Sequence, residues 1–125
     1  MDDDARQFLL GEQVLVVEDD AMVGMGLVNC LEDFGAEVFW CSTIEAALNN
    51  INEVHRIAIA IVDFNLNGST SVLILDTLIY REIPTVLCTG YDASFLEQRF
   101  HVLPCVAKPF TRSKMMAVLH KLVLK

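Results

Sequence analysis

Acidic residues gather where two short apolar runs end. Glu18-Asp19-Asp20 follows the run Val14–Val17, and Asp63 follows the run Ile57–Val62. Clustered carboxylates repel one another, so they stay ionised together only beside a cation. Mg²⁺ suits such a set, because it typically takes one or two carboxylates together with phosphate oxygens and water. These acids therefore predict a Mg²⁺ site, provided that the two run ends meet in the fold.

Two further apolar runs end in groups that suit phosphate. The run Thr85–Cys88 leads into Thr89-Gly90, and Val102–Ala107 leads into Lys108-Pro109. A lysine ammonium is a compact positive charge for a phosphoryl oxygen, and the threonine hydroxyl can donate to another. Phosphoryl transfer depends mainly on positioning and charge neutralisation. Acids, a hydroxyl and an ammonium in one crevice would supply both.

The four runs are predicted strands, and Glu37–Cys41 is a fifth. Helical patterns alternate with them over residues 23–34, 44–51, 71–80, 95–100 and 115–122, where Ser42 or Thr43, Asp92 and Thr111 are candidate caps. Asn67-Gly68 predicts a tight turn in the loop 65–69. The alternation predicts a doubly wound α/β fold, a five-stranded parallel sheet with helices on both faces. In the flavodoxin-like strand order 2-1-3-4-5, ligands bind at the carboxyl ends of the strands.

Four segments resemble the signature stretches of response-regulator receiver domains, the CheY-like domains of bacterial two-component systems. They are Val16–Asp20, Val62–Leu66, Cys88–Tyr91 and Ala107–Phe110. The resemblance runs from about Glu12 to Leu124, so residues 1–11 are interpreted as an N-terminal tail and 12–125 as the receiver domain. The chain is also similar to an alphaproteobacterial single-domain subclass named for a Phe-Ala-Thr-Gly-type signature, with cysteine in place of the alanine.

The resemblance implies a role for each matching residue. Asp63 would accept a phosphoryl group from a histidine kinase or a histidine phosphotransfer protein. Mg²⁺ would be held by Asp19 directly, by Glu18 through water, by Asp63 and by the backbone carbonyl of Asn65. Phosphoryl oxygens would bind Thr89 and Lys108, and the Lys108–Pro109 bond would be cis. Asp20 lies just outside this set, as an outer-shell residue.

The chain departs from the family at the switch. Receivers often carry Tyr or Phe three residues before the lysine, where the ring moves inward on activation, but Cys105 stands there. The usual coupling between Thr89 and that ring is then in doubt, and Tyr91 is the nearest candidate to replace it. Thr89, Gly90, Tyr91 and Cys105 are therefore the candidate switch residues.

Each feature also has an ordinary structural interpretation. The acidic triplet could cap a helix, Asp63 could be a turn residue and Thr89 a polar strand end; only the combination in register favours phosphoryl chemistry. Three other functions compete. A degenerate receiver would bind partners without phosphorylation. A small aspartate-nucleophile phosphotransferase or phosphatase would need an acid where Asn65 stands. A flavodoxin-type FMN carrier would need a hydroxyl- and glycine-rich loop where the acids lie.

The composition of the chain limits which classes of partner it can bind. The chain has 125 residues, 54% of them hydrophobic, and a net charge of −8 with no Lys/Arg cluster, which disfavours nucleic acid. It shows no secretory signal and no apolar run of membrane-spanning length. The scattered Cys30, Cys41, Cys88 and Cys105 favour a reducing, cytoplasmic setting. Because the last predicted helix ends the given sequence, either output passes through a downstream protein partner or the sequence is a fragment of a longer protein. We expect no output domain within this chain and no activity beyond self-phosphorylation and self-dephosphorylation, and a homodimer is compatible.

Overall fold

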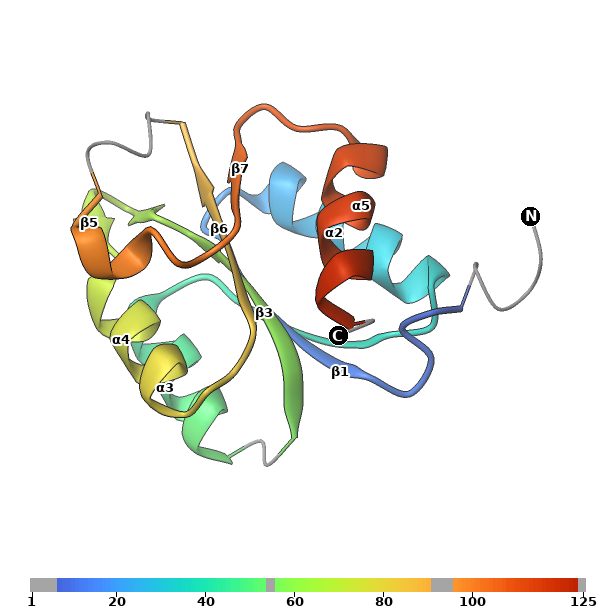
Figure 1. Ribbon diagram of the computed structural model, residues 1–125, viewed down its shortest axis with the longest axis horizontal. Helices are drawn as coiled ribbons and strands as arrows, with labels where there is room; N and C mark the ends of the chain where they lie inside the picture. Colours follow the sequence, from blue (N-terminus) through green and yellow to red (C-terminus); the bar gives the residue numbers. More distant parts are fainter. Residues whose placement is uncertain (1–6, 54–55, 91–95, 124–125) are drawn as a thin grey trace.

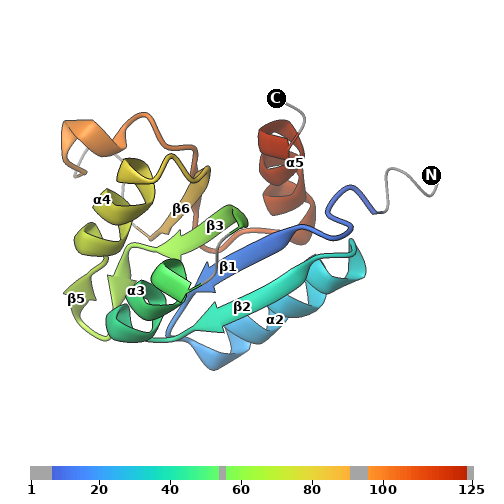
Figure 2. The ribbon, with the colours of Figure 1, turned by 90° about the horizontal axis from the view of Figure 1, so that it is seen from below.

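A five-stranded parallel sheet forms the centre of the computed structural model, which describes residues 7–53, 56–90 and 96–123. Its strands lie in the order β2-β1-β3-β6-β7; Figure 1 labels β1, β3, β6 and β7, and Figure 2 labels β2. Their bounds are β1 Gln13–Val17, β2 Glu37–Cys41, β3 Ile57–Asp63, β6 Thr85–Thr89 and β7 Cys105–Ala107. Counted along this sheet, the order is 2-1-3-4-5, so the predicted flavodoxin-like topology is confirmed.

Helices cover both faces of the sheet (Figure 2). α2 (Ala21–Asp33) and α5 (Arg112–Val123) lie on one face, and α3 (Ile44–Glu53) and α4 (Val72–Tyr80) lie on the other. Side chains of successive strand residues alternate between these layers. In β1, Val14 and Val16 join the cluster under α2 and α5, whereas Leu15 and Val17 join the cluster under α3 and α4. The strands that carry the candidate site are thus packed between two apolar cores, one on each face of the sheet.

Side-chain caps fix where three of the helices begin. The Asp20 carboxylate accepts the Met22 and Val23 amides at 2.9 and 3.0 Å, which satisfies two otherwise unpaired donors at the start of α2. The Thr43 hydroxyl accepts the Ala46 amide, and the Thr111 hydroxyl accepts the Lys114 amide. The cap interpretation of the acidic triplet therefore holds for its third member, Asp20.

The expected loop 65–69 is a short antiparallel hairpin, formed by β4 (Asn65–Leu66) and β5 (Ser69–Thr70). Its turn residues Asn67 and Gly68 both have positive φ, 51° and 85°. Asn-Gly favours such a two-residue turn because asparagine tolerates, and glycine readily adopts, the left-handed region. The predicted tight turn is confirmed, and it places Asn67 beside the end of the sheet.

The fourth helix is shorter than predicted. Within the described residues the segment contains only a 3-10 turn, η2 (Gln98–Phe100), and the proposed cap Asp92 lies outside those residues. Phe100 is 1% exposed and Leu96 is also buried, so the chain turns tightly to bring both into the core. The last strand begins at Cys105 rather than Val102, because Pro104 has no N–H and enters the sheet only through its carbonyl, which accepts the Leu87 amide.

Residues 7–11, which sequence analysis assigned to the tail, form a turn that packs against the domain. Leu9 is buried, and its amide donates to the Phe34 carbonyl at 3.2 Å. The Phe8 ring meets the rings of Phe34 and His120 edge-on, with centroids 5.3 and 4.9 Å apart. This segment therefore ties the end of α2 to α5.

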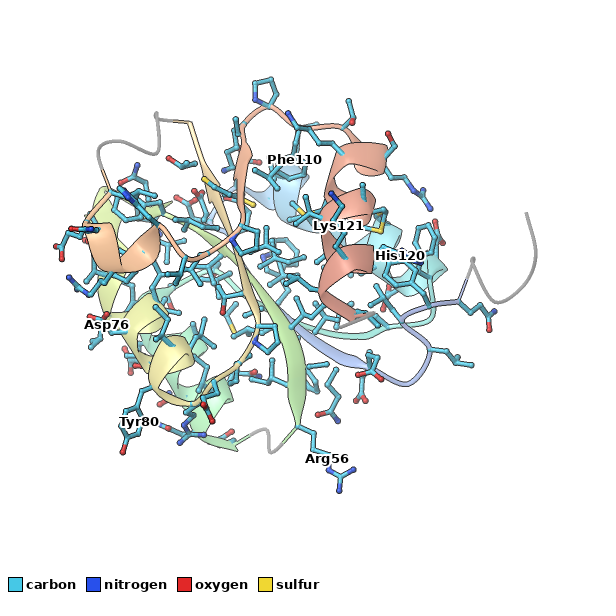
Figure 3. All side chains as sticks on the ribbon, viewed as in Figure 1. Arg56, Asp76, Tyr80, Phe110, His120 and Lys121 are labelled. Carbon is cyan, nitrogen blue, oxygen red and sulfur yellow. The ribbon has the colours of Figure 1, made fainter. Side chains whose placement is uncertain are left out.

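The apolar helix α4 buries only one side. Ile74, Leu75 and Leu78 are in the core, while Leu73 is exposed and Tyr80, 88% exposed, points away from the domain (Figure 3). In the part of the chain that the structure describes, no helix combines the length and the apolar character needed to cross a membrane.

Candidate functional site

The carboxyl ends of the central strands bring the predicted residues together. Asp63 ends β3, opposite Cys88 of β6, and Thr89 ends β6, opposite Ala107 of β7. The Thr89 carbonyl accepts the Lys108 amide at 2.9 Å, which fixes where the lysine leaves β7. On the other side, β1 delivers Glu18 and Asp19 at the same edge of the sheet. Parallel strands therefore do the positioning, as expected for this class of sheet.

The ammonium of Lys108 lies between two carboxylates. Its Nζ is 2.7 Å from Glu18 Oε1 and 2.8 Å from Asp63 Oδ2. Burial alone would lower the pKa of Lys108, but the two carboxylates outweigh it and raise that pKa above its usual value. Lys108 is thus a permanent positive charge aimed at Asp63. The Lys108–Pro109 peptide bond is cis, as the resemblance implies.

Three carboxylates form a cluster with the donor chemistry of a hard cation site. One oxygen each of Glu18, Asp19 and Asp63 lies within 4.8 Å of the others. Burial raises the pKa of Glu18 to about 7, and the neighbouring Asp63 adds to this rise, while Lys108 and the Asp20 amide oppose it. The part of this rise that comes from Asp63 reflects crowded negative charge, which a divalent cation would relieve. The residues present therefore fit Mg²⁺.

The hairpin β4-β5 closes the site from the side. The Asn67 amide donates to Asp19 Oδ2 at 2.9 Å, and this hydrogen bond lowers the pKa of Asp19. The Asn65 amide lies 3.4 Å from Asp63 Oδ1. Sequence reasoning gave Asn67 a turn role only. Its contact with Asp19 joins residues 48 positions apart, and no local pattern signals it.

The family model that describes the response regulator receiver domain matches residues 14–120. The chain belongs to this family. Solved structures of receiver domains are also similar. SdrG from Sphingomonas melonis Fr1 is 32% identical over 91% of this chain and 97% of that chain, with a TM-score of 0.74. The search of curated proteins gave no significant match.

Two structures with lower identity share the fold. The receiver domain of the PhyR response regulator from Erythrobacter litoralis is 19% identical over 94% of this chain and 93% of that chain, with a TM-score of 0.80. The response regulator TrrA from Thermotoga maritima, solved in complex with Mg²⁺ and BeF, is 19% identical over 89% of this chain and 98% of that chain, with a TM-score of 0.78.

In this receiver domain the structure describes three of the four candidate switch residues. Thr89 is buried at the end of β6, and Gly90 is exposed. Cys105 is exposed at the start of β7, opposite Leu87 of the neighbouring strand. Tyr91, the candidate replacement for the missing fifth-strand ring, lies outside the described residues.

One residue near the receiver site was not a sequence-based candidate. The indole Nε1 of Trp40 donates to the backbone carbonyl of Glu18 at 3.0 Å. In sequence, Trp40 is an aromatic residue of a strand, a type that is common in strands for packing reasons alone. Only the pairing of β2 with β1 shows that it lies behind the acidic pair.

Proposed function

We propose that this receiver domain is a phosphorylation-switched signalling module that accepts one phosphoryl group on Asp63. The proposal rests on the charged groups that surround the Asp63 carboxylate. Its Oδ2 is 2.8 Å from the Lys108 ammonium, and its carboxylate belongs to the cluster with Glu18 and Asp19. A nucleophilic carboxylate, a fixed cation and a hard-metal donor set in one crevice suit phosphoryl transfer better than any other reaction.

In the proposed reaction a carboxylate oxygen of Asp63 attacks the phosphorus of the donor. A new O–P bond forms, the bond from phosphorus to the donor atom breaks, and its electron pair leaves with the donor. Lys108 neutralises charge on the phosphoryl oxygens, and the Thr89 hydroxyl donates to another of them. Mg²⁺, when bound, would neutralise further phosphoryl charge; Asp19, Asp63 and the Asn65 carbonyl would hold it directly, and Glu18 through water.

The same proposal names the partners. A histidine kinase or a histidine phosphotransfer protein donates the phosphoryl group, and a downstream protein reads the phosphorylated surface. Membership of the receiver family supports both partners. SdrG, which is 31% identical to this chain in that comparison, has also been solved in a BeF3-activated conformation. We place the module in the cytoplasm, where reduced cysteines are expected; Cys30, Cys41, Cys88 and Cys105 are all free thiols. The domain acts on itself and turns over no separate substrate.

Phosphorylation by a small donor tests the proposal. Incubated with acetyl phosphate and Mg²⁺, the protein should gain one phosphoryl group in its intact mass, and Asp63→Asn should gain none. Asp76→Asn is the matched control, because Asp76 is a partly exposed aspartate on α4 that pairs with Arg99 and does not belong to the acidic cluster. Equal uptake by wild type and Asp63→Asn would refute the assignment. No uptake by any of the three would favour a phosphorylation-independent interaction module.

A further inference from the structure

Two consecutive residues of the edge strand β2 hold the backbone of Glu18. The Cys41 carbonyl accepts the Glu18 amide at 3.1 Å, which continues the β1-β2 ladder by one residue. The Trp40 indole Nε1 donates to the Glu18 carbonyl at 3.0 Å. Because an indole N–H can only donate, this carbonyl is a suitable partner for it. Both backbone polar groups of Glu18 are therefore fixed at the point where the chain leaves the sheet.

The same indole packs against Gly24 in the first turns of α2. A Cβ atom added to Gly24 would overlap the Trp40 ring at Cζ2, Cε2 and Nε1. Glycine is a poor helix former, and at Gly24 the close approach of the indole gives a packing reason for it. Gly26, two residues on, has open space around the same position. The close approach thus distinguishes Gly24 within its own helix.

The segment held in this way carries two of the three clustered carboxylates. Like charges within 4.8 Å of one another repel, so the backbone that bears them must resist spreading. Asn67 holds the Asp19 side chain, and the Asp20 amide holds Glu18 Oε2 at 3.1 Å. The Cys41 carbonyl and the Trp40 indole fix the Glu18 backbone itself from the β2 side of the sheet, and Trp40 is the one of the two that does so through its side chain.

We propose that Trp40 is a positioning residue for the Mg²⁺ and phosphoryl site: through the Glu18 carbonyl it sets where Glu18 and Asp19 face Asp63. This inference rests on the proposed function. Removal of a group that orients metal ligands typically weakens metal affinity by a factor of 10 to 100. Because Trp40 bonds to the Glu18 backbone and not to a ligand side chain, we expect Mg²⁺ affinity to fall about tenfold, at the lower end of that range.

Trp40→Phe is the direct test, because it keeps a ring against Gly24 and removes the N–H donor. Phe39→Leu is the control: Phe39 lies in the same strand and packs into the opposite core, under α3 and α4. Both variants should lower Tm. Calorimetric titration well below Tm should show about tenfold weaker Mg²⁺ binding for Trp40→Phe only. Unchanged affinity in Trp40→Phe, or an equal loss in Phe39→Leu, would overturn the proposal.

A second pair of variants leaves the tryptophan in place. Gly24→Ala should push the indole off the Glu18 carbonyl and weaken Mg²⁺ binding, as Trp40→Phe does. Gly26→Ala adds the same methyl group to the same helix in open space and should bind Mg²⁺ like wild type. Equal affinities in the two alanine variants would contradict the proposed role.

Amide hydrogen exchange in the metal-free protein separates this inference from the proposed function. The Asp20 and Asn67 amides donate to the carboxylates of Glu18 and Asp19, so both should exchange faster in Trp40→Phe and not in Phe39→Leu. Unchanged exchange would sink the positioning role even if the wild type is phosphorylated. Faster exchange in a protein that neither binds Mg²⁺ nor takes up phosphate would instead refute the proposed function, and would leave Trp40 only the placement of the Glu18 and Asp19 carboxylates.

Discussion

Among the individual residues, Lys108 determines how the acids share the site when no metal is bound. Its ammonium contacts Glu18 and Asp63 but no oxygen of Asp19 within the ion pairs of the described residues. Asp19 is held by a backbone amide instead, which keeps it ionised. An ionised carboxylate that is not already paired with an ammonium binds a metal cation most readily. The three acids therefore differ in role although they lie within one cluster.

Substitution of Asp19 should remove most of the Mg²⁺ affinity. A hard cation with few protein ligands loses a large part of its binding energy with each of them, so Asp19→Ala should show no Mg²⁺ binding in a calorimetric titration that detects it in wild type. Asp20→Ser removes the adjacent negative charge and keeps a good helix cap, so it should bind Mg²⁺ nearly as wild type does. Equal losses in the two variants would mean that total charge, rather than ligation by Asp19, attracts the ion.

Glu18 should make the metal-free protein pH-dependent. Its folded pKa, about 7, lies above its ordinary value of 4.5, so the folded state holds the proton more tightly than the unfolded state. This contribution to stability is complete below pH 4.5 and is lost as pH rises through about 7.

The comparison with Glu18→Gln measures this effect. Because the glutamine does not titrate, wild type should lose stability relative to the variant by up to about 3 kcal/mol between about pH 5 and pH 8. Denaturant unfolding with a chelator present gives the difference at each pH. A difference that stays constant with pH, or that grows in favour of wild type as pH rises, would contradict the raised pKa.

The connection from β6 to β7 adjoins the site at its start and packs against the domain at its far end. Its start, Gly90, adjoins the buried Thr89, and residues 91–95 lie outside the described part of the chain. Its far end is anchored: Phe100 is buried, and the Arg99 guanidinium donates to both oxygens of Asp76 on α4 at 2.9 Å. Cys105 is small and exposed, so it gives a displaced Thr89 no ring to exchange places with.

We predict that phosphorylation acts on Gly90–Phe100 rather than on Cys105. When Thr89 and Lys108 turn to the phosphoryl oxygens, the adjoining backbone must follow, and Gly90 gives it the freedom to do so. Hydrogen exchange with and without beryllofluoride and Mg²⁺ should change in this segment, more strongly before Leu96 than at the anchored Phe100. Asp63→Asn should show no change. Differences confined to the Asp63 pocket would indicate a phosphate sink or a passive scaffold.

For the molecule as a whole, the topology follows from the sequence more completely than the contacts do. The runs Val14–Val17 and Ile57–Val62 are apolar without interruption because helices cover both faces, and such runs indicate central parallel strands. Once the strand order was predicted, the meeting of Glu18, Asp63 and Lys108 followed from the rule that ligands bind at the carboxyl ends.

The contacts that the sequence could not predict depend on distant packing. Asn67 reaches Asp19 from the turn of the hairpin, Trp40 reaches Glu18 from the neighbouring strand, and Leu9 enters the core from a segment without a periodic pattern. Among the described residues a 3-10 turn replaces the fourth predicted helix for a local reason, because Phe100 is buried only four residues before Pro104. Side-chain to backbone bonds between distant segments leave no spacing that a linear pattern could reveal.

The position of the phosphoryl group is the most direct test of the account. After treatment with acetyl phosphate and Mg²⁺, borohydride reduction converts a phosphorylated aspartate into homoserine, which survives digestion. The tryptic peptide 57–81 contains both Asp63 and the more exposed Asp76, so its fragment ions compare the two within one molecule. We predict homoserine at Asp63 alone, dependent on Mg²⁺ and absent from Asp19→Ala. Homoserine at Asp76 or elsewhere, or at Asp63 to the same extent without Mg²⁺, would contradict it.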